Sequence, residues 1–254
     1  MDEIWVVSAG LVPYEEARSA QRAIAAARQE GEIPDVLLLL EHPPVYTKGK
    51  RASADELPMG EDWYRRQGIE VTQTDRGGWT TYHGPGQLVA YPIVSLRPYG
   101  DDVVGYVRKM EQVMMAALGD WGVATQVIDG LAGVWTLGQP PLAAGQVGPQ
   151  GTAVGPARGE GEARKIGSIG IHVDRGVTTH GLAINVNNDL QPFEWIVPCR
   201  IDAVRMTSLA RELGAQQDLV AFAETLTGHW ASIYEREPVQ RTLDELAGTG
   251  TQVR

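Results

Sequence analysis

The most constraining feature of the sequence is one short run of apolar residues. Val36–Leu40 is flanked by Pro34 and by Pro43-Pro44, so its length suits a β-strand. Because every position in the run is apolar, we expect a strand that is buried on both faces. No run approaches the ~18–20 apolar residues that a membrane-spanning helix needs. We therefore expect a globular domain and not a membrane-spanning protein.

Helix signals occur in four segments around this strand. They lie over about 13–30, after Asp101 or Asp102, after Thr207 or Ser208, and over about 218–235. The first begins with a proline and two glutamates and carries alanines at helical spacing until Gly31 ends it. The second has apolar residues at three- and four-residue steps, which indicates packing against the core.

Strand patterns alternate with these helices. They lie at 36–40, 69–73, 87–94, 124–128 and 132–135, with a hairpin formed by 165–173 and 177–186. The alternation lacks the regular repeat of a doubly wound fold. It predicts an α/β (α+β) domain with a mixed sheet flanked by helices.

The length allows either one decorated domain or two small ones, and we expect a single domain over residues 1–254. One segment does not fit a compact domain: residues 137–163 contain 7 Gly and 4 Pro and no periodic pattern. This composition predicts a flexible insertion. The end of the chain, residues 238–254, is expected to be a loose tail.

Charge and cysteine content exclude several classes of function. The net charge of −10 argues against general nucleic-acid binding, which needs a concentrated basic surface. The single cysteine, Cys199, excludes an internal disulfide and any metal site with two thiolates. The N-terminus, Met1–Trp5, begins acidic and resembles neither a secretory signal nor a transit peptide, so we expect a cytoplasmic protein.

The densest candidate site is a glycine-rich string from Arg76 to Gln87. Its four glycines let the backbone approach a ligand closely, while an arginine, a tyrosine and a histidine supply polar contacts. A glycine-rich hairpin around a buried histidine is the ordinary alternative. The string matches neither GxGxxG nor GxxxxGK[ST], so it supports neither a dinucleotide site nor a P-loop.

Two further residues are candidates for chemistry. Lys165 interrupts an otherwise small and apolar strand. Most such lysines lie on exposed sheet edges, but in a desolvated pocket the ammonium pKa falls and the side chain can transfer protons. Cys199 lies between Pro198 and Arg200, a setting that favours a thiolate, although a lone cysteine is often only a small buried hydrophobe.

A metal site is a weaker alternative. The residue types that such a site would need are present in His83, His172, His180 and Cys199, but their spacing matches none of the compact ligand patterns. We therefore expect no metal site.

Five motifs, taken in order, resemble the lipoyl(octanoyl) transferase family. The resemblance runs from about Glu41 to Ser208. The motifs are Glu41-His42-Pro43-Pro44-Val45-Tyr46-Thr47, the Arg76–Gln87 string with Leu88–Ile93 behind it, Lys165–Gly170, His180–Val186, and Pro198-Cys199. Any one of them alone is weak evidence, whereas five in this order are specific.

This resemblance implies an acyltransferase, an octanoyl-[acyl carrier protein]:protein N-octanoyltransferase. Such an enzyme moves an octanoyl group from acyl carrier protein to a lysine of a lipoyl domain through a cysteine thioester, without a cofactor, as the first step of endogenous protein lipoylation. Its acceptors are the lipoyl domains of 2-oxoacid dehydrogenase E2 subunits and the glycine cleavage H protein. The implied fold is similar to the catalytic domain of biotin and lipoate protein ligases.

Roles carried over from the family make Cys199 the nucleophile and Lys165 the residue that lowers its pKa. The implied acyl-binding residues come from three of the motifs. They are Arg76, Gly77, Gly78, Trp79, Thr80, Thr81, Tyr82, His83, Ser168, Ile169, Gly170, Gly181, Leu182 and Ala183.

Two other functions stay open at this stage. An ATP-dependent lipoate or biotin ligase shares the fold, but adenylate chemistry needs no thiol nucleophile. A non-catalytic module that binds acyl carrier protein or a lipoyl domain would leave Cys199 inert. The basic residues Lys48, Lys50, Arg51, Arg65 and Arg66 either dock an acidic carrier protein or belong to a solvated surface.

Overall fold

The computed structural model describes residues 2–139, 161–196 and 204–248. Its strands are β1 (Asp2–Leu11), β2 (Asp35–Glu41), β3 (Val45–Lys48), β4 (Glu70–Gln73), β5 (Thr80–His83), β6 (Gln87–Ile93), β7 (Thr125–Ile128), β8 (Leu131–Thr136), β9 (Lys165–Asp174), β10 (Val177–Asn185) and β11 (Arg236–Arg241). Its α-helices are α1 (Tyr14–Glu30), α2 (Glu61–Arg66), α3 (Val103–Asp120), α4 (Gln191–Glu194), α5 (Leu209–Leu213), α6 (Leu219–Tyr234) and α7 (Leu243–Gly248).

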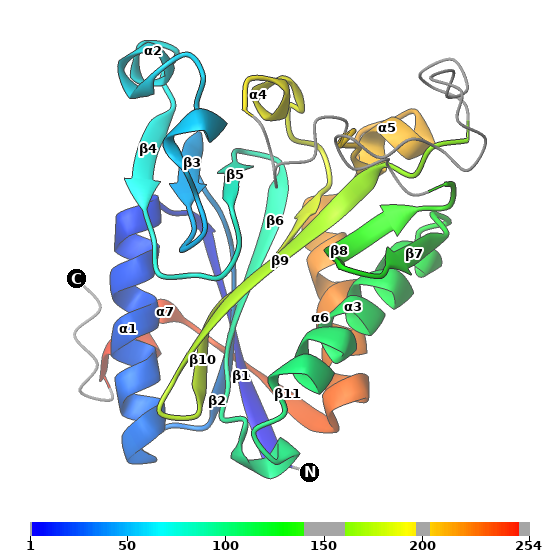
Figure 1. Cartoon of the computed structure of the whole chain (residues 1–254). Coiled ribbons are helices and arrows are strands. Elements are labelled where there is room, and N and C mark those ends of the chain that lie inside the picture. Colours follow the sequence, from blue (N-terminus) through cyan, green and yellow to red (C-terminus); the bar gives the residue numbers. More distant parts are fainter. Residues whose placement is uncertain (1, 140–160, 197–203, 249–254) are drawn as a thin grey trace.

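A large mixed sheet with helices on both faces forms the body of the protein (Figure 1). The strand order is β11-β1-β2-β6-β10-β9-β8-β7, with β1 parallel to both of its neighbours and the other pairs antiparallel. A smaller sheet, β4-β3-β5, lies at the end of the molecule that carries α2 and α4. The predicted mixed sheet flanked by helices is confirmed.

Helix α1 covers one face of the large sheet. It follows Pro13 and ends at Gly31, whose φ of 77° is the left-handed conformation that glycine adopts without strain. The buried side of the helix, which includes Ile24, packs in one core cluster with Leu38 and Leu40 of β2. The predicted helix over 13–30 is confirmed.

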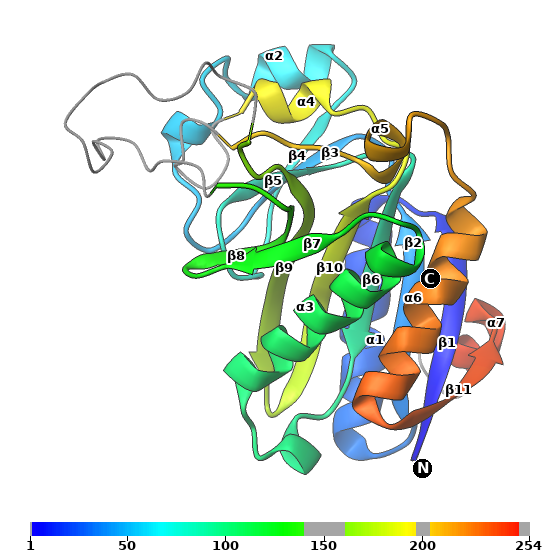
Figure 2. The same ribbon diagram turned by 90° about the vertical axis from the view of Figure 1, so that its right-hand side faces the viewer.

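Helices α3 and α6 lie side by side on the opposite face (Figure 2). Leu37 and Leu39 of β2 belong to the core cluster on this side, together with Met110 and Met114 of α3. Successive residues of β2 therefore enter different cores, which confirms a strand buried on both faces. The Asp102 carboxylate caps α3 by accepting from the Gly105 amide at 2.9 Å. No helix within the described ranges is both long and apolar enough to cross a bilayer.

The prediction of a loose tail from residue 238 is wrong for residues 238–248. Strand β11 runs parallel to β1 at the edge of the sheet, with Ile4 opposite Pro238 and Val6 opposite Gln240. An edge strand tolerates a proline because one side of it needs no amide donor. Leu246 of α7 is fully buried in the core beneath α1, and residues 249–254 lie outside the described residues.

Residues 137–163, predicted to be a flexible insertion, are described only at their two ends. The Gln139 amide donates to the Gly161 carbonyl at 2.6 Å, and the Ala163 amide donates to the Gln139 carbonyl at 2.8 Å. The two ends are therefore tied together beside β8 and β9. Residues 140–160 lie outside the described residues.

We predict that Gly181→Ala destabilises the fold by about 1–3 kcal/mol, because a Cβ there would lie 2.2 Å from the Ala90 carbonyl oxygen of β6. Urea denaturation measures the free energy of unfolding. Gly228→Ala in α6 is the matched control, because a Cβ at Gly228 has no heavy atom within 4 Å and alanine favours a helix. Equal stability of the two variants would contradict the close packing of β10 on β6.

Candidate functional site

A cavity of about 450 Å³ lies where β5, β8, β9 and β10 meet the loop before β5. The acyl-binding residues that the sequence indicated lie in segments far apart in the chain, and the fold brings all of them except Tyr82 to the wall of this cavity. Those that line it are Arg76, Gly77, Gly78, Trp79, Thr80, Thr81, His83, Ser168, Ile169, Gly170, Gly181, Leu182 and Ala183.

The loop before β5 is pinned against β9 by backbone contacts. The Gly77 amide donates to the Ile171 carbonyl at 2.9 Å. A Cβ at Gly170 would lie 3.2 Å from the Gly77 carbonyl oxygen, and one at Gly49 would lie 2.4 Å from that of Gly78. Within the string, a Cβ at Gly77 would lie 3.3 Å from the Ile171 carbonyl oxygen, and Gly78 has a φ of 87°, which favours glycine. Close backbone approach and backbone conformation therefore explain these two glycines.

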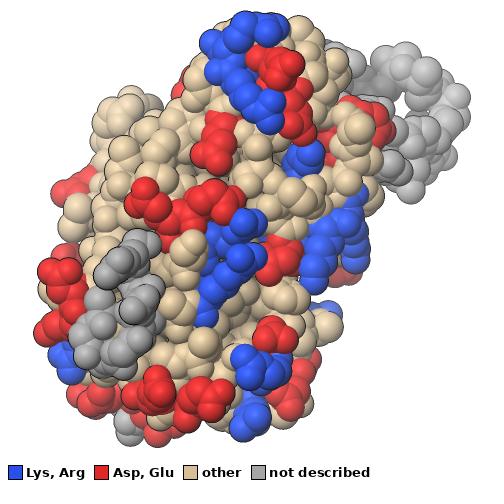
Figure 3. Space-filling view, turned by 90° about the vertical axis from the view of Figure 1, so that its left-hand side faces the viewer, with Lys and Arg blue, Asp and Glu red and all other residues tan. Residues whose placement is uncertain are grey.

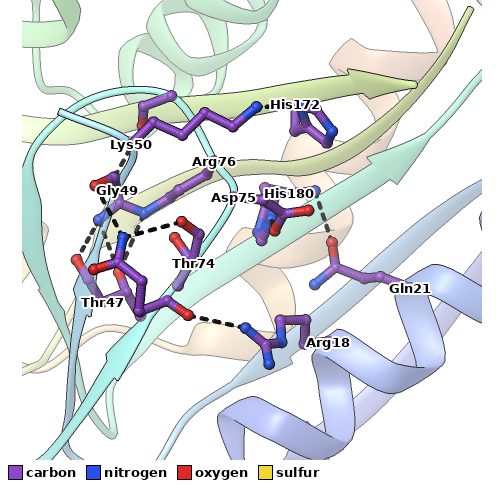
Figure 4. Close-up of polar contacts among 12 residues, drawn as sticks. Arg18, Gln21, Thr47, Gly49, Lys50, Thr74, Asp75, Arg76, His172 and His180 are labelled. Atoms are coloured by element: carbon purple, nitrogen blue, oxygen red, sulfur yellow. Dashed lines mark hydrogen bonds and ion pairs between the residues drawn. The ribbon is translucent and has the colours of Figure 1, made fainter.

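Arg76 fixes the same loop through its side chain. The guanidinium is buried and donates from Nε to Thr47 Oγ1 at 3.2 Å (Figure 4). Its Nη1 donates to the Gly77 carbonyl at 3.0 Å. Because Thr47 belongs to β3, the arginine joins the small sheet to the cavity wall. These bonds hold the loop before β5 in its conformation.

Tyr82 is the exception among the predicted lining residues. Side chains alternate along a strand, and the Tyr82 ring lies 5.6 Å from Tyr46 and 5.4 Å from Phe193 in the aromatic core of the small sheet. Tyr82 therefore does not line this cavity, whereas its neighbours Thr81 and His83 do.

Lys165 is buried and not an exposed edge lysine. It begins β9, which lies between β8 and β10 in the sheet. Its side chain lines the cavity, and Nζ lies 5.3 Å from the ring centroid of Trp135. Its backbone amide donates to the Arg205 carbonyl at 2.8 Å, and its carbonyl accepts from the Thr207 amide at 2.9 Å. The backbone of Lys165 is thus held by hydrogen bonds on both its amide and its carbonyl.

Sequence reasoning missed a carboxyl group within electrostatic range of Lys165. Glu111 of α3 is buried, and its Oε1 accepts from the Gly133 amide at 3.2 Å. Burial raises the pKa of Glu111, while the hydrogen bond from Gly133 and the positive charges of Arg108 and Lys165 act in the opposite direction. An acidic residue inside the apolar stripe of α3 was the signal that could have identified it.

Two buried histidines beside the cavity have lowered pKa values. Burial lowers the pKa of His42 to about 4, and it lowers that of His83 well below its ordinary value, with His42 contributing in the same direction. His42 Nδ1 donates to the Val12 carbonyl at 2.7 Å, and Nε2 accepts from the Tyr91 hydroxyl at 2.7 Å. His83 Nδ1 donates to Gln87 Oε1 at 2.7 Å. Both rings are therefore neutral near pH 7.

His180 lies at the cavity wall and is held on three sides. Its Nε2 lies 2.9 Å from Asp75 Oδ1, its Nδ1 lies 3.4 Å from the Tyr14 hydroxyl, and its amide donates to the Gln21 side chain (Figure 4). Burial lowers the pKa of His180, and the hydrogen bond from His180 lowers the pKa of Asp75. A neutral imidazole that donates to a carboxylate satisfies both shifts.

The remaining predicted residues fall in two groups. His172 lies on β9 opposite Thr179, within electrostatic range of His180, and its Nδ1 accepts from Lys50 Nζ at 3.2 Å (Figure 4). Cys199 lies outside the described residues. Among the described residues, no three histidine, cysteine or acidic side chains come close enough together to hold a metal ion.

The basic residues considered for docking are partly neutralised. Lys48 Nζ lies 2.7 Å from Glu61, and Arg65 pairs with both Glu61 and Asp62. On the face drawn in Figure 3, basic and acidic side chains are accordingly interspersed. Arg51 lines the cavity.

Sequence comparison places most of the chain in one family. The model of the lipoyl protein ligase A/B catalytic domain matches residues 13–231. The octanoyltransferase of Roseiflexus sp. (strain RS-1) is 40% identical over 239 residues, which are 94% of this chain and 90% of that protein. The octanoyltransferase of Solibacter usitatus is 41% identical over 228 residues, which are 90% of this chain and 91% of that protein.

Solved structures show the same fold. A bipartite lipoate protein ligase of Thermoplasma acidophilum superposes with a TM-score of 0.71 at 15% identity, covering 100% of this chain and 92% of that one. Lipoate-protein ligase A bound with ATP gives a TM-score of 0.65 at 15% identity, covering 100% and 94%. With its fold, its family match and its relatives in agreement, the chain belongs to the lipoyl protein ligase A/B catalytic domain family.

Proposed function

We propose that the protein transfers an octanoyl group from octanoyl-acyl carrier protein to a lysine of a lipoyl domain, through a thioester on Cys199. The acyltransferase class rests on the octanoyltransferases to which the chain is 37–41% identical over most of its length. The observation that carries the proposal is the cavity, which gathers the family's motif residues and the buried Lys165 on one wall.

The cavity suits an acyl chain because its wall combines apolar side chains with close backbone. Ile169, Leu182 and Trp135 line it. At Gly170 and Gly181 no side chain projects into the space. Each CH₂ that leaves water for such a wall contributes about 0.8 kcal/mol. A chain of eight carbons is therefore held mainly by burial, and its length is the property that the cavity can select.

The chain order supports a position for Cys199 near Lys165. The described chain resumes at Val204, which lines the cavity, and the next carbonyl, that of Arg205, accepts from the Lys165 amide. Cys199 precedes Val204 by only five residues. The described residues that follow Cys199 in the sequence therefore begin at the same cavity wall as Lys165.

The proposed reaction has two acyl transfers. The Cys199 thiolate attacks the thioester carbonyl carbon, and the carrier thiolate leaves with a proton from the Lys165 ammonium, which leaves Lys165 neutral. An acceptor lysine amine then attacks the new thioester, passes a proton to Lys165, and displaces the Cys199 thiolate. The first step exchanges one thioester for another, so it needs no ATP. The acceptors we propose are lipoyl domains of 2-oxoacid dehydrogenase E2 subunits and the glycine cleavage H protein.

We further propose that the reaction takes place in the cytoplasm. Its sole cysteine, Cys199, has to be a free thiol for the first step. Reducing compartments keep thiols in that form.

The proposal predicts an octanoyl adduct on Cys199 when the protein is incubated with octanoyl-acyl carrier protein in the absence of ATP. Intact-protein and peptide mass spectrometry detects the added mass and its position. Cys199→Ser is expected to lose the adduct and the transfer to a lipoyl domain. Near-normal transfer by Cys199→Ser, or an adduct that forms only with ATP, would contradict the proposal.

A second prediction concerns Lys165→Met, which removes the ammonium group and retains much of the side-chain volume. Cysteine acylation should slow by about 100-fold or more, the usual contribution of a positioned proton-transfer group, and the thiol pKa should rise. The rate of iodoacetamide alkylation against pH measures that pKa. Lys109→Met is the matched control, because Lys109 Nζ also packs on an aromatic ring, 5.1 Å from Tyr99, away from the cavity. An unchanged alkylation profile would reject the pairing.

A third prediction follows from the neutral imidazoles. The pKa of His42 is about 4 in the folded protein against 6.5 as an ordinary value. The unfolded chain therefore takes up a proton at His42 below pH 6.5 while the folded protein does not, so stability falls between pH 6.5 and 4. From pH 7.5 to 5, His42 accounts for about 2 kcal/mol of this loss.

Urea denaturation at pH 7.5 and 5 tests this dependence. His42→Gln should flatten the decline relative to the wild type. The other buried histidines, His83 and His180, have pKa shifts in the same direction and retain part of the decline. An identical decline in the His42 variant and the wild type would show that this imidazole is not held neutral.

A further inference from the structure

A second cavity, of about 320 Å³, gathers three arginines in a chain whose net charge is −10. We call it the arginine pocket. It is lined by Arg164, Arg205, Arg211, Glu194, Leu190, Phe193, Val204 and Met206. Its wall is therefore cationic at some points and apolar at others.

The guanidinium groups of this pocket are only partly paired. Arg164 forms an ion pair with Glu212 at 2.6 Å, but its Nε is buried with no hydrogen-bond partner. Arg205 Nε lies 3.9 Å from Glu162, and within the described residues the Arg211 side chain forms no ion pair. A buried donor without a partner is costly. A ligand with several anionic oxygens in the pocket would supply acceptors to Arg205 and Arg211.

The arginine pocket adjoins the cavity that contains Lys165. Val204 lines both cavities. Arg164 directly precedes Lys165, and the Arg205 carbonyl accepts from the Lys165 amide. A ligand with an acyl end and an anionic end can therefore reach both cavities at once.

We propose that the arginine pocket binds the phosphate group of the phosphopantetheine arm that carries the donor acyl group. This inference rests on the proposed function, because only a carrier-bound thioester has such an arm. The arm has its thioester at one end, its single phosphate at the other, and neutral amide and methyl groups between them. Leu190, Phe193 and Met206 form the apolar wall beside the arginines.

The test compares two small donors with the intact enzyme: octanoyl-pantetheine, which has no phosphate, and octanoyl-phosphopantetheine. Mass spectrometry measures the rate of Cys199 acylation by each. We expect kcat/KM in the wild type to be about tenfold higher with the phosphorylated donor, the effect of one charge-assisted hydrogen bond. Arg205→Ala and Arg211→Ala should each bring the ratio of the two rates toward one.

Arg175→Ala is the matched control, because Arg175 lies at the turn between β9 and β10, at the other end of β9 from Arg164. It removes the same charge and should leave the ratio unchanged. The wild-type comparison needs no variant, so it decides the question even where an alanine variant does not fold.

Three outcomes would overturn the inference. The first is equal use of both donors by the wild type, and the second is slowing of both donors by the same factor in the arginine variants. The third is that the variants retain the ratio and slow only the transfer from octanoylated enzyme to a lipoyl domain, which would assign the pocket to acidic side chains of the acceptor. Absence of a Cys199 adduct with every donor, octanoyl-acyl carrier protein included, would reject the proposed function itself.

Discussion

The cavity depends on backbone segments that touch without side chains between them. The loop that contains Gly77 lies on β9 at Gly170, and β10 lies on β6 where a Cβ at Gly181 would meet the Ala90 carbonyl at 2.2 Å. A side chain at either glycine would separate these segments. Hydrogen bonds alone do not explain the geometry, because they require the close approach first. The glycine pattern is therefore a packing constraint that shapes the space available to a ligand.

The polar groups around that space are compatible with an apolar ligand because most of them are already satisfied within the protein. His42, His83 and His180 use ring nitrogens in hydrogen bonds to the backbone or to neighbouring side chains, and burial keeps the rings uncharged. The Arg76 guanidinium lies within electrostatic range of His83 and His180, and the buried Glu111 lies within that of Lys165. The neutral histidines therefore add no charge to a cavity wall that already carries Arg76 and Lys165.

Much of the fold was predictable from local signals in the sequence. The cap at Asp101 or Asp102, the stop at Gly31 and the all-apolar strand Val36–Leu40 are each decided by neighbouring residues. The structure confirms all three and assigns the cap to Asp102. The pairing of β11 with β1 was missed because it joins residues more than 200 positions apart, and Pro238 argued locally against a strand. Local sequence patterns do not predict a strand that pairs with the edge of the sheet from the other end of the chain.

The site was predictable in membership more than in geometry. The motifs identified the residues that line the cavity, but the side to which each points depends on strand alternation, which sends Tyr82 into the aromatic core and His83 to the cavity. Glu111 was missed because the apolar stripe of a helix predicts which residues are buried but does not predict which groups surround a buried carboxyl group. Lys165 shows the same limit: its partners are the carbonyl of Arg205 and the amide of Thr207, about 40 residues later. These bonds join Lys165 to residues 205–207, which follow Cys199 in the sequence. A shift of that backbone therefore moves Lys165 and changes the cavity wall.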